Sequence, residues 1–182
     1  LDDALSCEIL PNGNLEIGVH ISDVSYFLKE NSELDEIVKE KATTIYLVDT
    51  VYHMLPVPLC LLCSLLPGAD KMAYSVFWEI NGETAEILST RFSRSVLNSC
   101  AKLSYDHAQM VIEKENEDWS DLEKEFPEIH NGFAVSDVAN VIVKLQKIAV
   151  ILRTKRKENG ALKIDQPKIS FRFDKDDQRM EA

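Results

Sequence analysis

Two adjacent aspartates at the start of the sequence could bind a divalent cation. Asp2 and Asp3 stand at the edge of residues 5–10, a segment with the composition of a buried β-strand. Neighbouring residues on a strand point to opposite faces, so both carboxylates reach one ion only through a bend or with help from further carboxylates. By itself an Asp-Asp pair is more typical of a loop or a cap than of a catalytic centre.

The four cysteines form a second candidate for chemistry. Cys60 and Cys63 are the closely spaced pair, and two such pairs would indicate zinc, while one pair at a helix start could indicate a redox site. Leucines separate this pair, and Cys7 and Cys100 stand alone. Free thiols packed among apolar residues are therefore favoured, and a disulfide-stapled secreted fold is not. We expect a reducing compartment, cytoplasmic or nuclear.

The histidines and two tyrosines complete the candidates. No histidine has metal-ligand spacing, so His20, His53, His107 and His130 are interpreted as structural or surface residues. Tyr46 and Tyr105 lie beside polar residues in "TTIYLVD" and "KLSYDH", where a ring could pack in the core or stack on a nucleobase. From the residues alone, core packing is favoured.

Composition bounds the fold and the partners. A chain of 182 residues, 45% of them hydrophobic, is long enough for one domain with a core, and prolines interrupt its longest uncharged stretch, which is a poor membrane span. The net charge of −11 argues at first against nucleic acid, but residues 113–128 alone contribute −6 while residues 144–163 contribute +6. An acidic loop or insertion at 113–132 on a locally basic domain fits this distribution, and so do ordinary solvated faces.

Strands and helices alternate along the chain and predict an α+β fold, with a mixed, largely antiparallel sheet and packed helices. Asn12-Gly13 predicts a hairpin, Ser32 and Ser104 predict helix caps, and residues 136–158 carry one apolar helical face that we expect to pack on the sheet. The predicted strands are 5–10, 15–22, 73–80, a bent or broken strand within 83–97, 161–165 and 168–174. The predicted helices run from 33 to at least 43, from 105 to 113 and from 136 to 158.

A series of motifs resembles the catalytic domain of the ribonuclease II (RNB) family. "LDDAL", "GVHISDVSYFL", "TTIYLVD", "LCSLLPG", "DKMAYSVFW", "RSVLNSCAKLSYDHAQ" and "GALKIDQPKISF" occur in the family's order and at nearly its spacing. The resemblance covers essentially the whole chain and is strongest to the eukaryotic Dis-three-like exonucleases, with a leaning toward the second paralogue. It implies that residues 1–182 are one partial RNB-type domain, truncated at both ends.

The resemblance also implies the site. The family motif holds four aspartates, of which Asp2 and Asp3 match the last two, and the others would precede Leu1. These carboxylates are expected to bind Mg²⁺, with Mn²⁺ as an alternative, and to be catalytic. Tyr46 matches a tyrosine near the bases in the RNA channel, and Tyr105 matches one near the terminal nucleotide.

The implied activity is 3′-to-5′ hydrolysis of single-stranded RNA to nucleoside monophosphates, with a preference for 3′ uridine tails. The implied setting is cytoplasmic, independent of the exosome and without a membrane partner, and flanking oligonucleotide-binding domains would belong to the full-length chain. We expect the 182-residue piece alone to be inactive and marginally folded. Where the family has proline before "MLP", this chain has His53, and "LL" replaces an acidic pair before "LCSL". A non-catalytic RNA-binding or regulatory remnant of the family stays open as the alternative.

Overall fold

A four-stranded antiparallel sheet forms the centre of the molecule in this computed structural model, which describes residues 1–114, 119–162, 172–173 and 180–181. The strand order is β1 (Asp3–Ile9), β2 (Leu15–Ser22), β5 (Asp70–Ile80) and β6 (Ile87–Asn98). The predicted hairpin at Asn12-Gly13 is confirmed, since Gly13 has a φ of 85° and the flanking strands pair from Ile9–Leu15 onward. The α+β class is confirmed as well.

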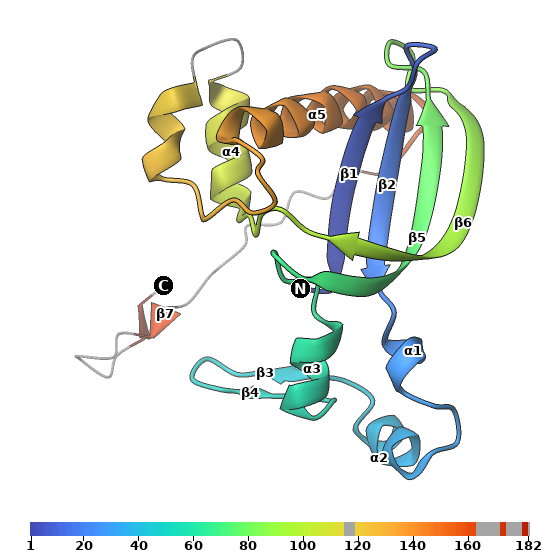
Figure 1. Cartoon of the computed structure of the whole chain (residues 1–182), viewed down its shortest axis with the longest axis vertical. Helices are drawn as coiled ribbons and strands as arrows, with labels where there is room; N and C mark the ends of the chain where they lie inside the picture. The colour runs from blue at the N-terminus through green and yellow to red at the C-terminus, as the bar shows by residue number, and fades with distance from the viewer. Residues whose placement is uncertain (115–118, 163–171, 174–179, 182) are drawn as a thin grey trace.

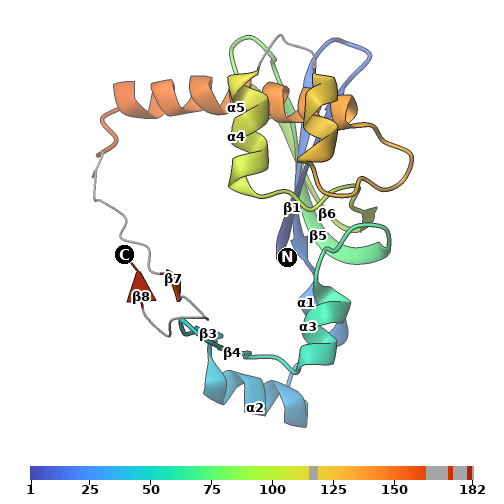
Figure 2. The same ribbon diagram turned by 90° about the vertical axis from the view of Figure 1, so that its left-hand side faces the viewer.

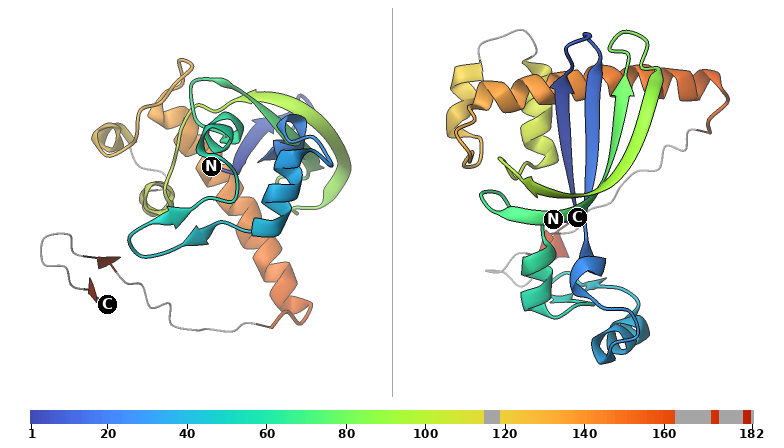
Figure 3. Two further views of the ribbon diagram at one scale, coloured as in Figure 1. Left: turned by 90° about the horizontal axis from the view of Figure 1, so that it is seen from below. Right: turned by 45° about the vertical axis from the view of Figure 1, so that its right-hand side comes forward.

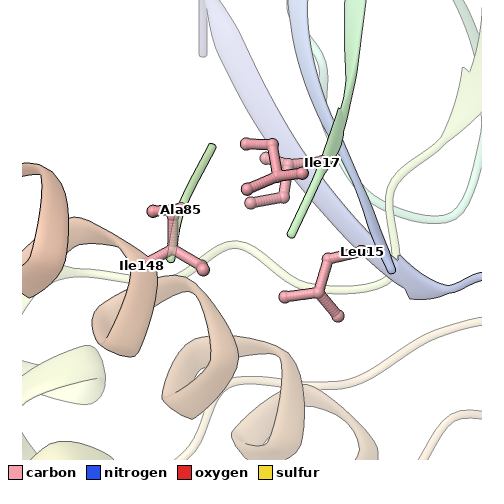
Figure 4. Packing of buried hydrophobic residues seen from close by; sticks show 5 residues of the cluster. Leu15, Ile17, Ala85 and Ile148 are labelled. Atoms are coloured by element: carbon pink, nitrogen blue, oxygen red, sulfur yellow. The ribbon is translucent and has the colours of Figure 1, made fainter. Parts of the chain in front are cut away.

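The helix α5 (Val135–Glu158) crosses one face of this sheet (Figures 1 and 3). Ile148 of α5 packs against Leu15, Ile17 and Ile80 of the sheet and against Ala85 of the β5–β6 turn (Figure 4). Each buried aliphatic side chain of this kind contributes about 1.5–3 kcal/mol. The predicted helix over 136–158 is therefore confirmed, and it covers the end of the sheet at which the hairpin turns lie.

A second core joins α5 to α4 (Tyr105–Glu113) and to the 3₁₀ helix η1 (Trp119–Lys124). Leu122 and Phe126 are buried there although they come from the acidic segment. The predicted cap of α4 is confirmed, because the Ser104 hydroxyl accepts the His107 amide while His107 Nδ1 accepts the Ser104 amide. Part of the acidic segment thus packs on the domain.

The chain between β2 and β5 forms a small lobe beyond one end of the sheet (Figure 1). Its elements are α1 (Val24–Phe27), α2 (Glu33–Lys41), β3 (Ile45–Tyr46), β4 (Val51–Tyr52) and α3 (Val57–Cys63). Lys71 Nζ donates to the carbonyls of Leu61 and Leu62, at 3.0 and 3.2 Å, and so places a cation at the carbonyl end of α3.

Several expected boundaries differ from the structure. The first long helix of the lobe ends at Lys41, two residues before the expected Thr43, because Ala42 has a left-handed φ of 59°. The segment expected to bend or break is one continuous strand, β6, which is bent: it curves strongly along its length (Figure 1). Its pairing with β5 skips Leu88 between the pairs Glu79–Ser89 and Ile80–Ile87.

The end of the chain differs from the expected strand pair. Ala161 and Leu162 are not in a strand, and the rest of the pair expected over 161–165 and 168–174 lies largely outside the described residues. Within the described part, β7 (Arg172–Phe173) pairs with β8 (Met180–Glu181). No helix among the described residues has both the length and the apolar character needed to cross a membrane.

Candidate active site at the N-terminal corner of the sheet

Asp2 and Asp3 occupy one corner of the sheet, where β1 begins. Asp3 is the first residue of β1 and lies opposite Ile21, while the Asp2 carbonyl accepts the Ser22 amide at 2.9 Å. The Leu1 carbonyl accepts the Leu65 amide at 2.9 Å. Backbone bonds on both sides therefore fix the position of this acidic pair.

The two aspartates differ in their relation to β1, because Asp3 begins the strand and Asp2 precedes it. Asp3 shares its face with Cys7, four residues along β1, and Cys7 packs against the core beneath α5. Asp3 is thus on the α5 face, whereas Asp2 precedes the strand, so the alternation of faces does not determine its direction. Both residues are exposed, and neither carboxylate has a hydrogen-bond or ion-pair partner within the described part of the chain.

These exposed carboxylates fit a magnesium site that further groups must complete. Mg²⁺ prefers oxygen ligands and is often held by one or two carboxylates together with water and substrate phosphates. Among the described residues, no group of three or more His, Cys, Asp or Glu side chains gathers into a metal site. Asp2 and Asp3 would therefore supply part of the coordination, and the remaining ligands would come from elsewhere.

Tyr46 and Tyr105 are on the surface, so the interpretation of both rings as core residues is wrong. Tyr46 is 76% exposed in β3, and Tyr105 is 96% exposed as the first residue of α4. Tyr46 lies in the two-stranded β3–β4 hairpin, and Tyr105 follows the Ser104 cap at the start of α4. Exposed rings of this kind are available for stacking on bases.

The structure does not bring these rings into one cluster with the aspartates. The four side chains come from the start of β1, from β3 and from the start of α4. In Figures 1 and 2 the N-terminus lies at a level between α4 and the β3–β4 hairpin, and the hairpin extends to the same side of the sheet as α5 in Figure 2. Asp3 and the two tyrosine-bearing elements thus share one side of the sheet.

Asp23 and Arg94 form an ion pair beside this corner that was not predicted from the sequence. Asp23 caps α1 and is only 6% exposed, and its carboxylate accepts the Ser25 hydroxyl at 2.6 Å, the Tyr26 amide at 3.1 Å and Arg94 Nε at 3.2 Å. Both residues line a cavity of about 170 Å³ with Met72 and Val96. The available signal was an aspartate directly between a strand and a short helix, which is typical of an N-cap.

His20 has the structural role expected from the sequence. It is 7% exposed, and its Nε2 lies 2.9 Å from the Ser6 hydroxyl while Nδ1 lies 2.7 Å from that of Ser75. Ser75 in turn bonds to Ser95, so a polar chain crosses all four strands. Burial lowers the pKa of His20, which keeps the ring neutral between the hydroxyls.

The cysteines also match their expected role. All four are free, and burial raises the pKa of the Cys7, Cys63 and Cys100 thiols. A raised pKa disfavours the thiolate, which is the form that binds metals and attacks disulfides. Packing rather than reactivity explains these side chains.

Comparisons with known proteins place these features in a family. The family model described as "RNB domain" matches residues 1–182. The "DIS3-like exonuclease 2" of Xenopus tropicalis is 47% identical over 97% of this chain and 21% of its own length. The "Inactive exonuclease DIS3L2" of Arabidopsis thaliana is 41% identical over 96% of this chain and 16% of its own length. The chain therefore spans at most about a fifth of these curated relatives.

A solved structure has a similar fold. Mycoplasma genitalium RNase R, solved in complex with ribose-methylated single-stranded RNA, superposes with a TM-score of 0.77 at 21% identity, covering 96% of this chain and 25% of that one. At this identity the likeness shows the fold alone. With a family model that matches every residue and relatives above 40% identity, the chain belongs to the RNB domain family.

Proposed function

We propose that this chain carries two of the metal-binding carboxylates of a magnesium-dependent 3′-to-5′ exoribonuclease that hydrolyses single-stranded RNA to nucleoside monophosphates. The observation that carries the proposal is the position of Asp2 and Asp3. In a chain of the RNB family, both are exposed at a fixed corner of the sheet, and neither has a described partner that would give it a merely structural role.

Each residue has a separate task in this reaction. Asp2 and Asp3 would hold Mg²⁺, or Mn²⁺ in its place, and the bound cation would polarise the scissile phosphate and activate the attacking water. The bonds from Ser22 and Leu65 hold the backbone of the acidic pair in place, so that little reorganisation is needed when RNA arrives. Tyr46 and Tyr105 would stack on bases of the bound strand, because both rings are exposed.

The finer properties of the proposal follow the resemblance to the second Dis-three-like paralogue. They comprise a preference for 3′ uridine tails, a cytoplasmic setting, independence from the exosome, and flanking oligonucleotide-binding domains in the full-length protein. The 47% identity to the Xenopus relative supports this choice of paralogue. We also expect the isolated 182-residue chain to hydrolyse no RNA, since it offers only part of a magnesium coordination shell.

The test is hydrolysis of a 3′-labelled single-stranded RNA by the full-length natural protein in the presence of Mg²⁺. Asp3→Asn is expected to slow release of the labelled nucleotide by about 100-fold or more, because a metal ligand is lost, and EDTA is expected to stop it. Glu8→Gln is the matched control, since it neutralises another exposed carboxylate of β1. Hydrolysis unchanged by both Asp2→Asn and Asp3→Asn would refute the site.

The second candidate is a non-catalytic RNA-binding or regulatory member of the family. The Arabidopsis relative that is named inactive favours it, because 41% identity links this chain to a protein without the activity. Such a protein would bind RNA with an affinity that falls steeply with salt, and would hydrolyse none in Mg²⁺ or Mn²⁺. The same labelled RNA, assayed for binding and for hydrolysis, separates the two candidates.

A further inference from the structure

Four residues from four strands form one row across the α5 face of the sheet. Asp3 lies opposite Ile21, Ile21 opposite Tyr74, and Tyr74 opposite Arg94. Directly opposed residues on neighbouring strands project to the same face. With strands about 4.8 Å apart, the Cα atoms of Asp3 and Arg94 at the two ends are roughly 14 Å apart.

The row lies on the part of this face that α5 leaves uncovered. Ile21 is 48% exposed and Tyr74 is 51% exposed, whereas Ile17 and Ile80 beneath α5 are only 7% and 3% exposed. The covered positions thus lie toward the hairpin-turn end of the strands, and the exposed row lies toward the other end. A ligand could therefore lie along the row without displacing the helix.

Arg94 is already held in position for a ligand at its end of the row. Its Nε donates to the carboxylate of Asp23, whose side chain is 5% exposed, while the Arg94 side chain itself remains 64% exposed. The ion pair uses Nε, Nη2 donates to the Ser25 hydroxyl over a long 3.5 Å, and most of the side chain stays accessible to solvent. A guanidinium positioned in advance loses less conformational entropy when it binds a phosphate.

We infer that this row is a track for the single-stranded RNA adjoining the scissile phosphate, with Tyr74 stacking on a base and Arg94 binding a backbone phosphate. The inference rests on the proposed function and extends it to residues outside the family motif. A carboxylate at one end suits a cation, a guanidinium at the other suits a phosphate, and an aromatic ring lies between them. A ligand that touches both ends must be extended and must alternate flat rings with negative charges, as a nucleic acid strand does.

The competing occupant is a protein segment, because Leu5 and Val96 on the same face are also exposed. A purely apolar partner would offer no acceptor to the guanidinium of Arg94, and covering this charged group would cost free energy of desolvation. The fixed cation beside an exposed aromatic ring therefore favours RNA. The experiment includes the protein occupant as an outcome.

The experiment measures binding of a fluorescein-labelled single-stranded oligouridylate to the full-length natural protein by anisotropy, in EDTA, over a series of NaCl concentrations. Arg94→Gln is expected to weaken binding about 3- to 10-fold and to reduce the slope of log affinity against log salt by about 1. Tyr74→Leu is expected to weaken binding by about 5-fold or more without changing the slope.

Arg91→Gln is the matched control. Arg91 is an exposed arginine of the same strand, but it projects to the opposite face, where it pairs with Glu16 and lies 3.7 Å from the ring centre of Phe77. We expect its variant to bind RNA like the unmodified protein. Thermal unfolding of each variant verifies that it is folded, and Tyr74→Leu tests the row even if the loss of the Asp23 partner destabilises Arg94→Gln.

The inference is overturned if Arg94→Gln and Tyr74→Leu bind RNA like the control. It is also overturned if they alter only the unfolding temperature or self-association, since the face would then contact protein. Hydrolysis by the unmodified protein that Asp3→Asn abolishes would in either case leave the proposed function standing. A protein that neither binds nor hydrolyses the RNA would instead contradict the proposed function and this inference together.

Discussion

Two adjacent residues of β2, His20 and Ile21, project to opposite faces of the sheet, and the polar groups on these two faces differ in their exposure to solvent. His20 faces one side, where its ring and the hydroxyls of Ser6 and Ser75 form a polar chain that is buried at His20 and Ser75. Ile21 faces the other, in the exposed row that joins Asp3 to Arg94. The buried chain satisfies its own hydrogen bonds, while the exposed row leaves a carboxylate and most of a guanidinium accessible.

This difference distinguishes polar side chains that stabilise the fold from polar side chains that are available to bind a ligand. Histidine and serine are residue types common in active sites, yet here they bond to one another, and the central pair, His20 and Ser75, is buried. A buried polar network of this kind stabilises only as a complete set, because a single unpaired member costs the desolvation of its partners. Changes to the buried chain should therefore alter stability, and changes to the exposed row should alter RNA binding and hydrolysis.

The largest expected effect on stability comes from His20→Ala. The change removes one hydrogen-bond partner from each of the Ser6 and Ser75 hydroxyls and creates a cavity, so we expect the free energy of unfolding to fall by about 2–4 kcal/mol. Denaturant titration of the full-length protein measures it. Ile21→Ala is the neighbouring control and should cost about 1 kcal/mol or less, since half of that side chain is already exposed. Equal losses would erase the distinction between the two faces.

Gly18→Ala should have the next largest effect. A Cβ at position 18 would meet the Ser6 hydroxyl and would lie 2.6 Å from Nε2 of His20, so the buried chain has to shift. We expect a loss of about 1–3 kcal/mol in the free energy of unfolding. At Gly82 a Cβ would meet only Leu15, at 3.7 Å, and Gly82→Ala provides the control in the same denaturant titration. A loss at position 82 as large as that at 18 would contradict the explanation.

The pH dependence of stability should reveal the buried ring. Burial lowers the pKa of His20 below its ordinary value of 6.5, so the unfolded chain binds the proton more readily than the folded one. The stability that depends on the neutral ring is complete above pH 6.5 and declines as the pH falls below it, by at most about 1.4 kcal/mol per pH unit. Denaturant titrations between pH 8 and 5 measure the slope, which His20→Asn should flatten. An unchanged slope would show that other groups cause it.

Arg91→Gln should have the smallest effect on stability. The pair with Glu16 has an N–O distance of 3.2 Å, but its side chains are 57% and 27% exposed, so water screens much of the attraction. With the loss of the contact to Phe77, we expect a change of about 1 kcal/mol or less, measured by thermal unfolding. A larger loss would mean that the exposed end of this face also has a structural role.

The sequence was informative where one local signal determines the structure. Asn12-Gly13 predicted the hairpin, and the apolar face of residues 136–158 predicted α5, because turn chemistry and helical periodicity act over a few neighbouring residues. The lobe was less predictable. Its strands β3 and β4 have two residues each, too few for an alternating pattern. Ala42 ends α2 in a left-handed conformation, which an alanine in the sequence does not predict.

The candidate site shows the same limit. Asp2, Asp3 and both tyrosines were identified through a family resemblance, whereas their own residue types favoured a cap and a core. Asp23 and Arg94 lie 71 positions apart, and they meet only because β2, β5 and β6 pair in one particular register. Register depends on the whole sheet, so no local pattern could have predicted this ion pair.

The backbone bonds of the N-terminal corner give the lobe a mechanical link to the carboxylates. The lobe leaves the sheet after Ser22 and returns at Leu65, and these two residues donate to the carbonyls of Asp2 and Leu1. Both ends of the 22–65 excursion are thus tied to the residues that bear the acidic pair. A tilt of the excursion would therefore act on the backbone that bears Asp2 and Asp3, so the orientation of the lobe and the spacing of the two carboxylates are coupled.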